Sequence, residues 1–194
     1  MGGRGARSAS SLTIVNRSVT YAPPAGRIGD RQVGDILDEA VEAGAILYEK
    51  PRTSKDMARD LFAHAALYLD GRRFTVLAER TSDQDGKKGG TNVDLLMHDG
   101  VYWEVKSPIS DGRGKDPLRF VQRRMEEAEH DFQDDPRTKR EHTRLVLNSA
   151  YTSVPDSAIR ERLVAELDGH PNIKEVLFVK KDGSLESFIQ KRSP

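Results

Sequence analysis

Four stretches of the chain repeat apolar residues every three or four positions, and each of them predicts a helix. Pro51 should end the first helix, and Ser54 is a suitable N-cap for the second. Asp116 should cap the third helix, with Pro117 at its first position. The four predicted helices are residues 30–48, 54–69, 116–132 and 155–167.

Shorter apolar or alternating stretches predict strands. A glycine-rich loop at residues 81–91 separates the first predicted strand from the second. From the second helix onward the elements alternate between helices and groups of strands, which predicts an α/β fold with a mixed sheet. The predicted strands are residues 74–79, 92–97, 101–106, 144–148, 173–180 and 184–190.

The first part of the chain differs in composition from the rest. Residues 1–29 are rich in Gly, Ser, Arg and Pro, and no acidic residue occurs before Asp30. This predicts a disordered basic arm, either a solubilising leader or a nucleic-acid-binding segment. We therefore divide the chain into this arm, an N-terminal helix with its linker at 30–53, and a main domain at 54–190.

Composition narrows the chemistry that the chain can support. There are no cysteines among the 194 residues, which excludes disulfides and thiolate zinc sites. The five histidines have no metal-binding spacing, so any metal should have oxygen ligands, as Mg²⁺ or Mn²⁺ does. No apolar run approaches the length of a membrane span, and the start lacks the apolar core of a signal peptide. We expect a cytoplasmic site of action and no membrane partner.

The loop His98-Asp99-Gly100 joins two strands whose register can be predicted. A three-residue loop with Gly100 in the left-handed region pairs 97 with 101, 95 with 103 and 93 with 105. One face of the hairpin is then wholly apolar, with Val93, Leu95, Met97, Val101, Trp103 and Val105. The other face carries Asn92, Asp94, Leu96, Tyr102, Glu104 and Lys106.

This register places Asp94 opposite Glu104, with Cβ atoms about 4.5–5.5 Å apart, and Lys106 on the same face. Two facing carboxylates repel each other unless a cation lies between them. Such a pair could hold Mg²⁺, which would polarise a phosphodiester and lower the pKa of a bound water. Lys106 would orient that water or stabilise the transition state. A solvated sheet face is the competing interpretation, because an acid–x–Lys triplet such as Glu104-Val105-Lys106 arises easily by chance in a chain with 32% charged residues.

Asp94 followed by Glu104-Val105-Lys106 resembles the signature of the PD-(D/E)XK nucleases, the restriction-endonuclease-like superfamily. The run from residue 92 to 108 is similar to the tRNA-cleaving toxin domains at the C-termini of contact-dependent growth-inhibition proteins and other polymorphic toxins. Further matches are residues 145–147 and the ending at 173–183, so the resemblance covers about 54–190.

The resemblance implies a three-layer restriction-endonuclease-like core, cleavage of tRNA with Mg²⁺ or Mn²⁺, an immunity protein as partner, and delivery by a larger carrier. It also implies an acid on the first core helix. Asp56 or Asp60 would take that place, where the family usually has Glu, and Glu79 is a further candidate.

Several other side chains are candidates for substrate binding. Lys87 and Lys88 in the glycine-rich loop, and Arg119 and Arg123 on the third helix, could contact backbone phosphates. The acids interleaved on that helix, Glu126, Glu127, Glu129 and Asp131, favour a solvated face instead. Tyr102 faces the site side and could stack on a base, whereas Trp103 should lie in the core.

Three functions are compatible with these residues. The favoured one is a metal-dependent endoribonuclease that cleaves tRNA as a toxin. A DNA endonuclease of phage or repair type would use the same Asp94, Glu104 and Lys106. A non-catalytic module that binds nucleic acid or a protein partner is the third, and the intact Asp–Glu–Lys set argues against it.

Overall fold

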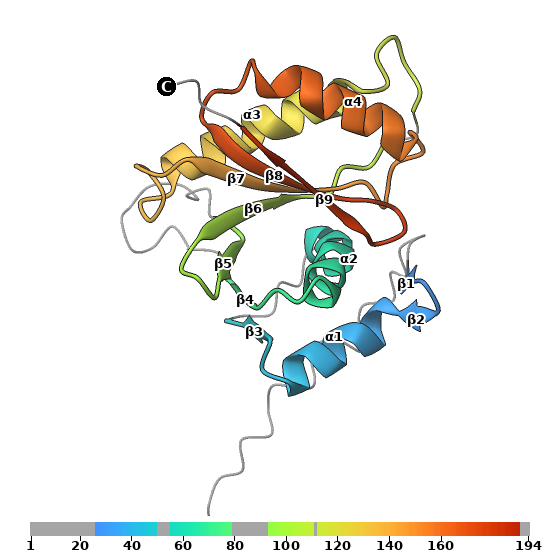
Figure 1. Ribbon diagram of the computed structural model, residues 1–194, viewed down its shortest axis with the longest axis vertical. Coiled ribbons are helices and arrows are strands. Elements are labelled where there is room, and N and C mark those ends of the chain that lie inside the picture. The colour runs from blue at the N-terminus through green and yellow to red at the C-terminus, as the bar shows by residue number, and fades with distance from the viewer. Residues whose placement is uncertain (1–25, 50–54, 79–92, 111, 191–194) are drawn as a thin grey trace, which may run out of the picture.

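A seven-stranded sheet lies at the centre of the protein, with helices on both of its faces (Figure 1). The computed structural model describes residues 26–49, 55–78, 93–110 and 112–190. The strands follow one another across the sheet in chain order, from β3 to β9. Their bounds are β3 Ile46–Tyr48, β4 Phe74–Val76, β5 Leu95–Met97, β6 Tyr102–Lys106, β7 Thr143–Asn148, β8 Ile173–Val179 and β9 Leu185–Ile189.

The sheet is mixed. The pairs β3–β4, β6–β7 and β7–β8 are parallel, and β4–β5, β5–β6 and β8–β9 are antiparallel. A helix connects the strands of each parallel pair, because parallel neighbours need a crossover. These helices are α2 (Lys55–Leu69), α3 (Arg119–Asp134) and α4 (Asp156–Leu167). The predicted α/β class with a mixed sheet and three layers is confirmed.

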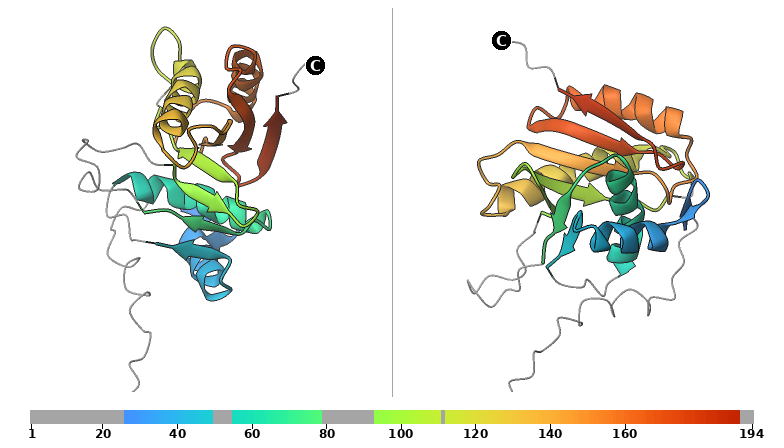
Figure 2. Two further views of the ribbon diagram at one scale, coloured as in Figure 1. Left: turned by 90° about the vertical axis from the view of Figure 1, so that its left-hand side faces the viewer. Right: turned by 60° about the horizontal axis from the view of Figure 1, so that its bottom comes forward.

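Two apolar clusters hold the three layers together. Along β7 the side chains alternate between them: Val146 packs toward α1 and α2, while Leu145 and Leu147 pack toward α3 and α4. Figure 2 shows these two helix pairs on opposite faces of the sheet. Within the described residues, α2 is buried along most of its length, because it lies between the sheet and α1 (Val33–Glu42).

The prediction of one helix over residues 30–48 is wrong. The helix α1 ends at Glu42, and Gly44 follows it with a φ of +64°. The Gly44 N–H donates to the Val41 carbonyl, and the Ala45 N–H donates to the Ala40 carbonyl. These two bonds form a Schellman motif, which satisfies the last carbonyls of the helix and turns the chain into β3.

Smaller corrections concern element ends. Residues 27–28, predicted as part of the disordered arm, form β1 (Arg27–Ile28), which pairs with β2 (Arg31–Gln32). Asp116 does not cap α3. Its Oδ1 accepts the Leu118 N–H at 3.0 Å, so it closes the turn before the helix. The rest of the arm, residues 1–25, and the glycine-rich loop lie outside the described residues.

No helix in the described segments is long and apolar enough to cross a bilayer.

Candidate active site

The β5–β6 hairpin has the predicted register. Leu95 pairs with Trp103 and Leu96 with Tyr102, and Gly100 in the turn has a φ of +82°. The Gly100 N–H donates to the Met97 carbonyl at 2.9 Å. This register, continued by one residue, brings Asp94 beside Glu104.

Main-chain contacts hold Asp94 in place. Its Oδ2 accepts the Val105 N–H at 3.0 Å, and its carbonyl accepts the Leu77 N–H at 2.9 Å. The preceding Val93 N–H donates to Asp135, a fully buried acid at the end of α3. Asp94 is therefore fixed to both neighbouring strands, and the chain just before it is fixed to α3.

Glu104 is a buried carboxylate with only one satisfied oxygen. It is 3% exposed, and Lys106 Nζ donates to its Oε1 at 2.7 Å. Its Oε2 is shielded from solvent and has no hydrogen-bond partner among the described residues. Burial raises the pKa of Glu104 well above its ordinary value, and the negative charge of Asp94 raises it further.

Asp131 of α3 is the site residue that the sequence did not identify. Lys106 Nζ donates to its Oδ2 at 2.5 Å, so one ammonium group bridges β6 and α3. The interpretation of all the interleaved acids on this helix as a solvated face is therefore wrong for Asp131. A signal was present: Asp131 is three residues after the buried Ala128, a spacing that makes the two neighbours on the helix surface.

The charge of Lys106 is stabilised by its surroundings. Burial alone would lower the pKa of this ammonium, but the charge of Glu104 and the hydrogen bonds to Asp131 and Glu104 outweigh it and raise the pKa above its ordinary value. At neutral pH Lys106 is therefore a fixed positive charge and cannot accept a proton. It can stabilise negative charge that develops beside it.

A hollow lined by arginines lies at the start of α3. Its volume is about 660 Å³, and Arg119, Arg123, Arg124, Ile109 and Phe120 are among its lining residues. Glu127 connects the hollow to the centre. It pairs with Arg123 at 2.9 Å and also with Arg124. Against the effect of burial, these hydrogen bonds lower the pKa of Glu127, and the positive charge of Lys106 lowers it further. The predicted phosphate-binding residues Arg119 and Arg123 thus lie together, roughly three and two helical turns before Asp131, the partner of Lys106.

The two aromatic residues of β6 face opposite ways. Trp103 is 3% exposed and packs in the core, as predicted. Tyr102 is half-buried on the α3 side, and the guanidinium of Arg137 lies over its ring, 5.7 Å from the ring centroid. Arg137 covers one face of this ring, so a base would stack on the other face or take the place of Arg137, and Tyr102 as a stacking residue stays a prediction.

The expected acid on the first core helix has a different neighbourhood. Asp60 is buried on α2. Burial raises the pKa of Tyr48, and the negative charge of Asp60 raises it further. A further carboxylate beside Lys106, that of Asp131, comes from α3, and Asp60 as the acid of the first core helix stays a prediction. The side chains of Asp56, Glu79, Lys87 and Lys88 lie outside the described residues.

The centre fits a small hard cation. Within the described segments no group of three or more His, Asp or Glu residues is arranged to hold a metal ion. Mg²⁺ is commonly held by one or two carboxylates, with water and substrate phosphate completing its shell. Asp94 and Glu104 supply two, and the buried Oε2 of Glu104 is an oxygen that such a ligand would satisfy.

Comparisons with known proteins give little further information. No family model matches the chain, and no curated protein is similar to it in sequence. Among solved structures, a chain of the "CdiA-CT/CdiI toxin and immunity complex from Burkholderia pseudomallei" is similar at 16% sequence identity. The match covers 73% of this chain and 92% of that one, with a TM-score of 0.47. A TM-score this low assigns neither a fold family nor a function.

Proposed function

We propose that this protein is a metal-dependent nuclease that cleaves a phosphodiester at the Asp94–Glu104–Lys106 centre. One observation carries the proposal: the buried Glu104 has an oxygen without a partner, directly beside a second carboxylate and a fixed ammonium group. A buried carboxylate with an unsatisfied oxygen is costly for a fold, and a divalent cation removes the cost.

Asp94 and Glu104 are the residues that would hold Mg²⁺ or Mn²⁺. When bound, the ion would supply Lewis-acid polarisation of the phosphate and a more acidic water. Lys106 would stay protonated, because its pKa is raised, and would stabilise the charge that accumulates on the phosphate oxygens. Asp131 would hold the Lys106 ammonium in place through its hydrogen bond. Arg119 and Arg123 would position neighbouring phosphates.

The favoured substrate is tRNA, and the favoured role is that of a toxin. This choice rests on the resemblance of residues 92–108 to the tRNA-cleaving toxin domains. An immunity protein that blocks the site, and delivery by a larger carrier, belong to the same proposal. A DNA endonuclease would use the same centre, so the substrate has to be decided by experiment.

Expression in bacteria tests the role. The chain should stop growth and fragment tRNA, seen on Northern blots, while a Glu104→Gln variant should do neither. The matched control Glu161→Gln changes an exposed acid on α4, which lines neither the carboxylate centre nor the arginine hollow, and should remain toxic. Intact tRNA beside degraded chromosomal DNA would refute the tRNA assignment and favour the DNA endonuclease.

A further inference from the structure

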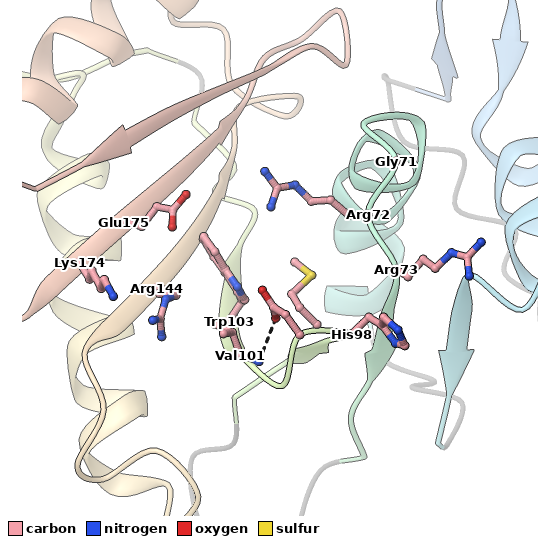
Figure 3. Close-up of a pocket in the computed structure, with 11 residues that line it drawn as sticks. Gly71, Arg72, Arg73, His98, Val101, Trp103, Arg144, Lys174 and Glu175 are labelled. Atoms are coloured by element: carbon pink, nitrogen blue, oxygen red, sulfur yellow. Dashed lines mark hydrogen bonds between the residues drawn. The ribbon is translucent and has the colours of Figure 1, made fainter.

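A second hollow lies on the opposite face of the hairpin from the carboxylate pair (Figure 3). Its volume is about 460 Å³, and its walls come from the turn after α2, the β5–β6 hairpin and the starts of β7 and β8. Trp103 lines it, on the side of β6 that faces away from Glu104. The candidate active site does not use this hollow.

Basic side chains from three separate segments line the hollow. Arg72 follows α2, while Arg144 and Lys174 are the second residues of β7 and β8. In Figure 3 Arg72 and Arg144 lie on either side of Trp103, and Arg73 points away from it. In a chain of zero net charge, such a convergence makes a local positive field.

These charges are only partly neutralised. Arg72 pairs with Asp70 at 2.9 Å, and the nearest carboxylate of Arg144 is Glu141, at 3.8 Å. Among the described residues, no carboxylate forms an ion pair with Lys174. Two acids also line the hollow: Asp99, which accepts the Val101 N–H, and Glu175, which accepts the Ser187 hydroxyl. Both keep their negative charge, but the four cations in the lining outnumber them.

The size and lining of the hollow indicate which ligand it takes. A volume of about 460 Å³ is typical of a small-ligand pocket, so it can admit a nucleotide, whereas a folded acidic surface could not enter it. Guanidinium groups match the geometry of phosphate oxygens, which favours a phosphate over an isolated carboxylate. Met97, Val101 and Trp103 add an apolar wall for a sugar or base.

We infer that this hollow binds a backbone phosphate of a nucleic-acid strand through Arg72, Arg144 and Lys174. Trp103 precedes Lys106 by three residues of β6, about 10 Å along the strand, and its side chain is on the opposite face of the sheet. A nucleic-acid molecule that contacts both sites would therefore pass around the end of the sheet. The hollow would then be a second contact that holds substrate away from the cleaved bond. The inference rests on the proposed function only in taking nucleic acid as the ligand.

Salt-dependent binding tests this inference. Labelled tRNA and labelled duplex DNA are titrated separately with a Glu104→Gln protein in a metal-free buffer, so that no cleavage occurs. A double variant, Arg72→Gln with Lys174→Gln, is added to that background. The matched control is Arg160→Gln with Lys180→Gln, which removes one arginine and one lysine, as the test variant does. Both of these residues pair with Glu186, outside the hollow. Melting curves verify that all the variants fold.

Each lost phosphate contact makes the slope of log K against log salt shallower by roughly 0.7–0.9. We therefore expect the Arg72/Lys174 variant to bind at least one of the two nucleic acids more weakly, with a slope shallower by about 1.5, and the control to match its parent. Equal slopes for both variants, or a parent that binds neither nucleic acid, would overturn the inference.

Cleavage by the wild-type chain is measured separately and decides the proposed function. Cleavage with equal slopes would refute the second phosphate site and leave the nuclease intact. A shallower slope in the Arg72/Lys174 variant without any cleavage would support the second site and refute the nuclease.

Discussion

At the scale of single residues, Glu104 combines burial, a neighbouring carboxylate and an unpartnered oxygen. Because its pKa is raised in the folded protein, the folded state keeps this proton at pH values where the unfolded chain has released it. The stability that this proton provides is present at acid pH and is lost as the pH rises through the folded-state pKa. At neutral pH, without metal, Glu104 should therefore weaken the fold.

Glu104→Gln should accordingly stabilise the metal-free protein at neutral pH. We expect a rise in Tm of about 2–4 °C, which corresponds to roughly 1 kcal/mol for a chain of this size. The gain over wild type should grow as the pH rises above the ordinary range of a glutamate, which thermal denaturation across pH would measure. Glu161→Gln, at an exposed acid on α4, is the control. A gain that does not vary with pH would contradict the role of the buried charge.

Lys106 should stabilise the fold, because its ammonium group offsets the negative charges of Glu104 and Asp131. Removing one partner of a buried ion pair typically costs 3–5 kcal/mol, so Lys106→Ala should lower the free energy of unfolding by about 3 kcal/mol or more. Lys180→Ala, which breaks a more exposed pair with Glu186, should cost less than about 1 kcal/mol. Chemical denaturation measures both, and equal small losses would show that Lys106 is not needed for charge balance.

At the scale of elements, α3 completes the site that the hairpin begins. Its Asp131 positions Lys106, and the arginines near its start line the hollow described above. Asp131→Asn should let the pKa of Lys106 fall, because a charged acceptor is lost. We expect the alkaline limb of the pH–rate profile for cleavage to move to lower pH.

Asp134→Asn is the control for that variant, because Asp134 lies on the same helix with its side chain 55% exposed. Its pH–rate profile should match the wild type. If Asp131→Asn also keeps the wild-type profile, Asp131 does not position Lys106 for the reaction.

The turn from α1 into β3 depends on one glycine. An L side chain at φ +64° costs about 1–2 kcal/mol, so Gly44→Ala should destabilise the protein by about 1 kcal/mol even though nothing lies within 4 Å of the added Cβ. Gly34→Ala, inside α1 and equally uncrowded, should instead stabilise it by up to about 1 kcal/mol. Urea denaturation would give both values. The same sign for the two substitutions would contradict the Schellman ending.

At the scale of the whole molecule, the sequence predicted the elements with long, regular patterns. Both α/β crossovers on the α3 and α4 side and the register of the β5–β6 hairpin follow from periodicity and turn chemistry. Three short strands were missed. The strand β3 has three residues directly after a helix, and β1 and β2 have two residues each, so no alternation could reveal them.

The sequence could predict only those site residues that lie close to one another along the chain. Asp94, Glu104 and Lys106 share one hairpin, so their register could be derived from neighbouring residues. Asp131 lies 25 residues beyond Lys106, and only the packing of α3 against β6 brings the two together. The unpartnered oxygen of Glu104 is also a tertiary property, since it depends on how the layers close around it.

The most direct test of the central claim is cleavage of bulk tRNA and of plasmid DNA by the purified chain, with Mg²⁺ and with a chelator. The wild type and the Glu161→Gln control should cut in Mg²⁺ and stop cutting in the chelator. Glu104→Gln should not cut in either condition, although it remains folded. Undiminished cleavage by Glu104→Gln, or cleavage by the wild type in the chelator, would contradict a metal-dependent centre at Asp94 and Glu104.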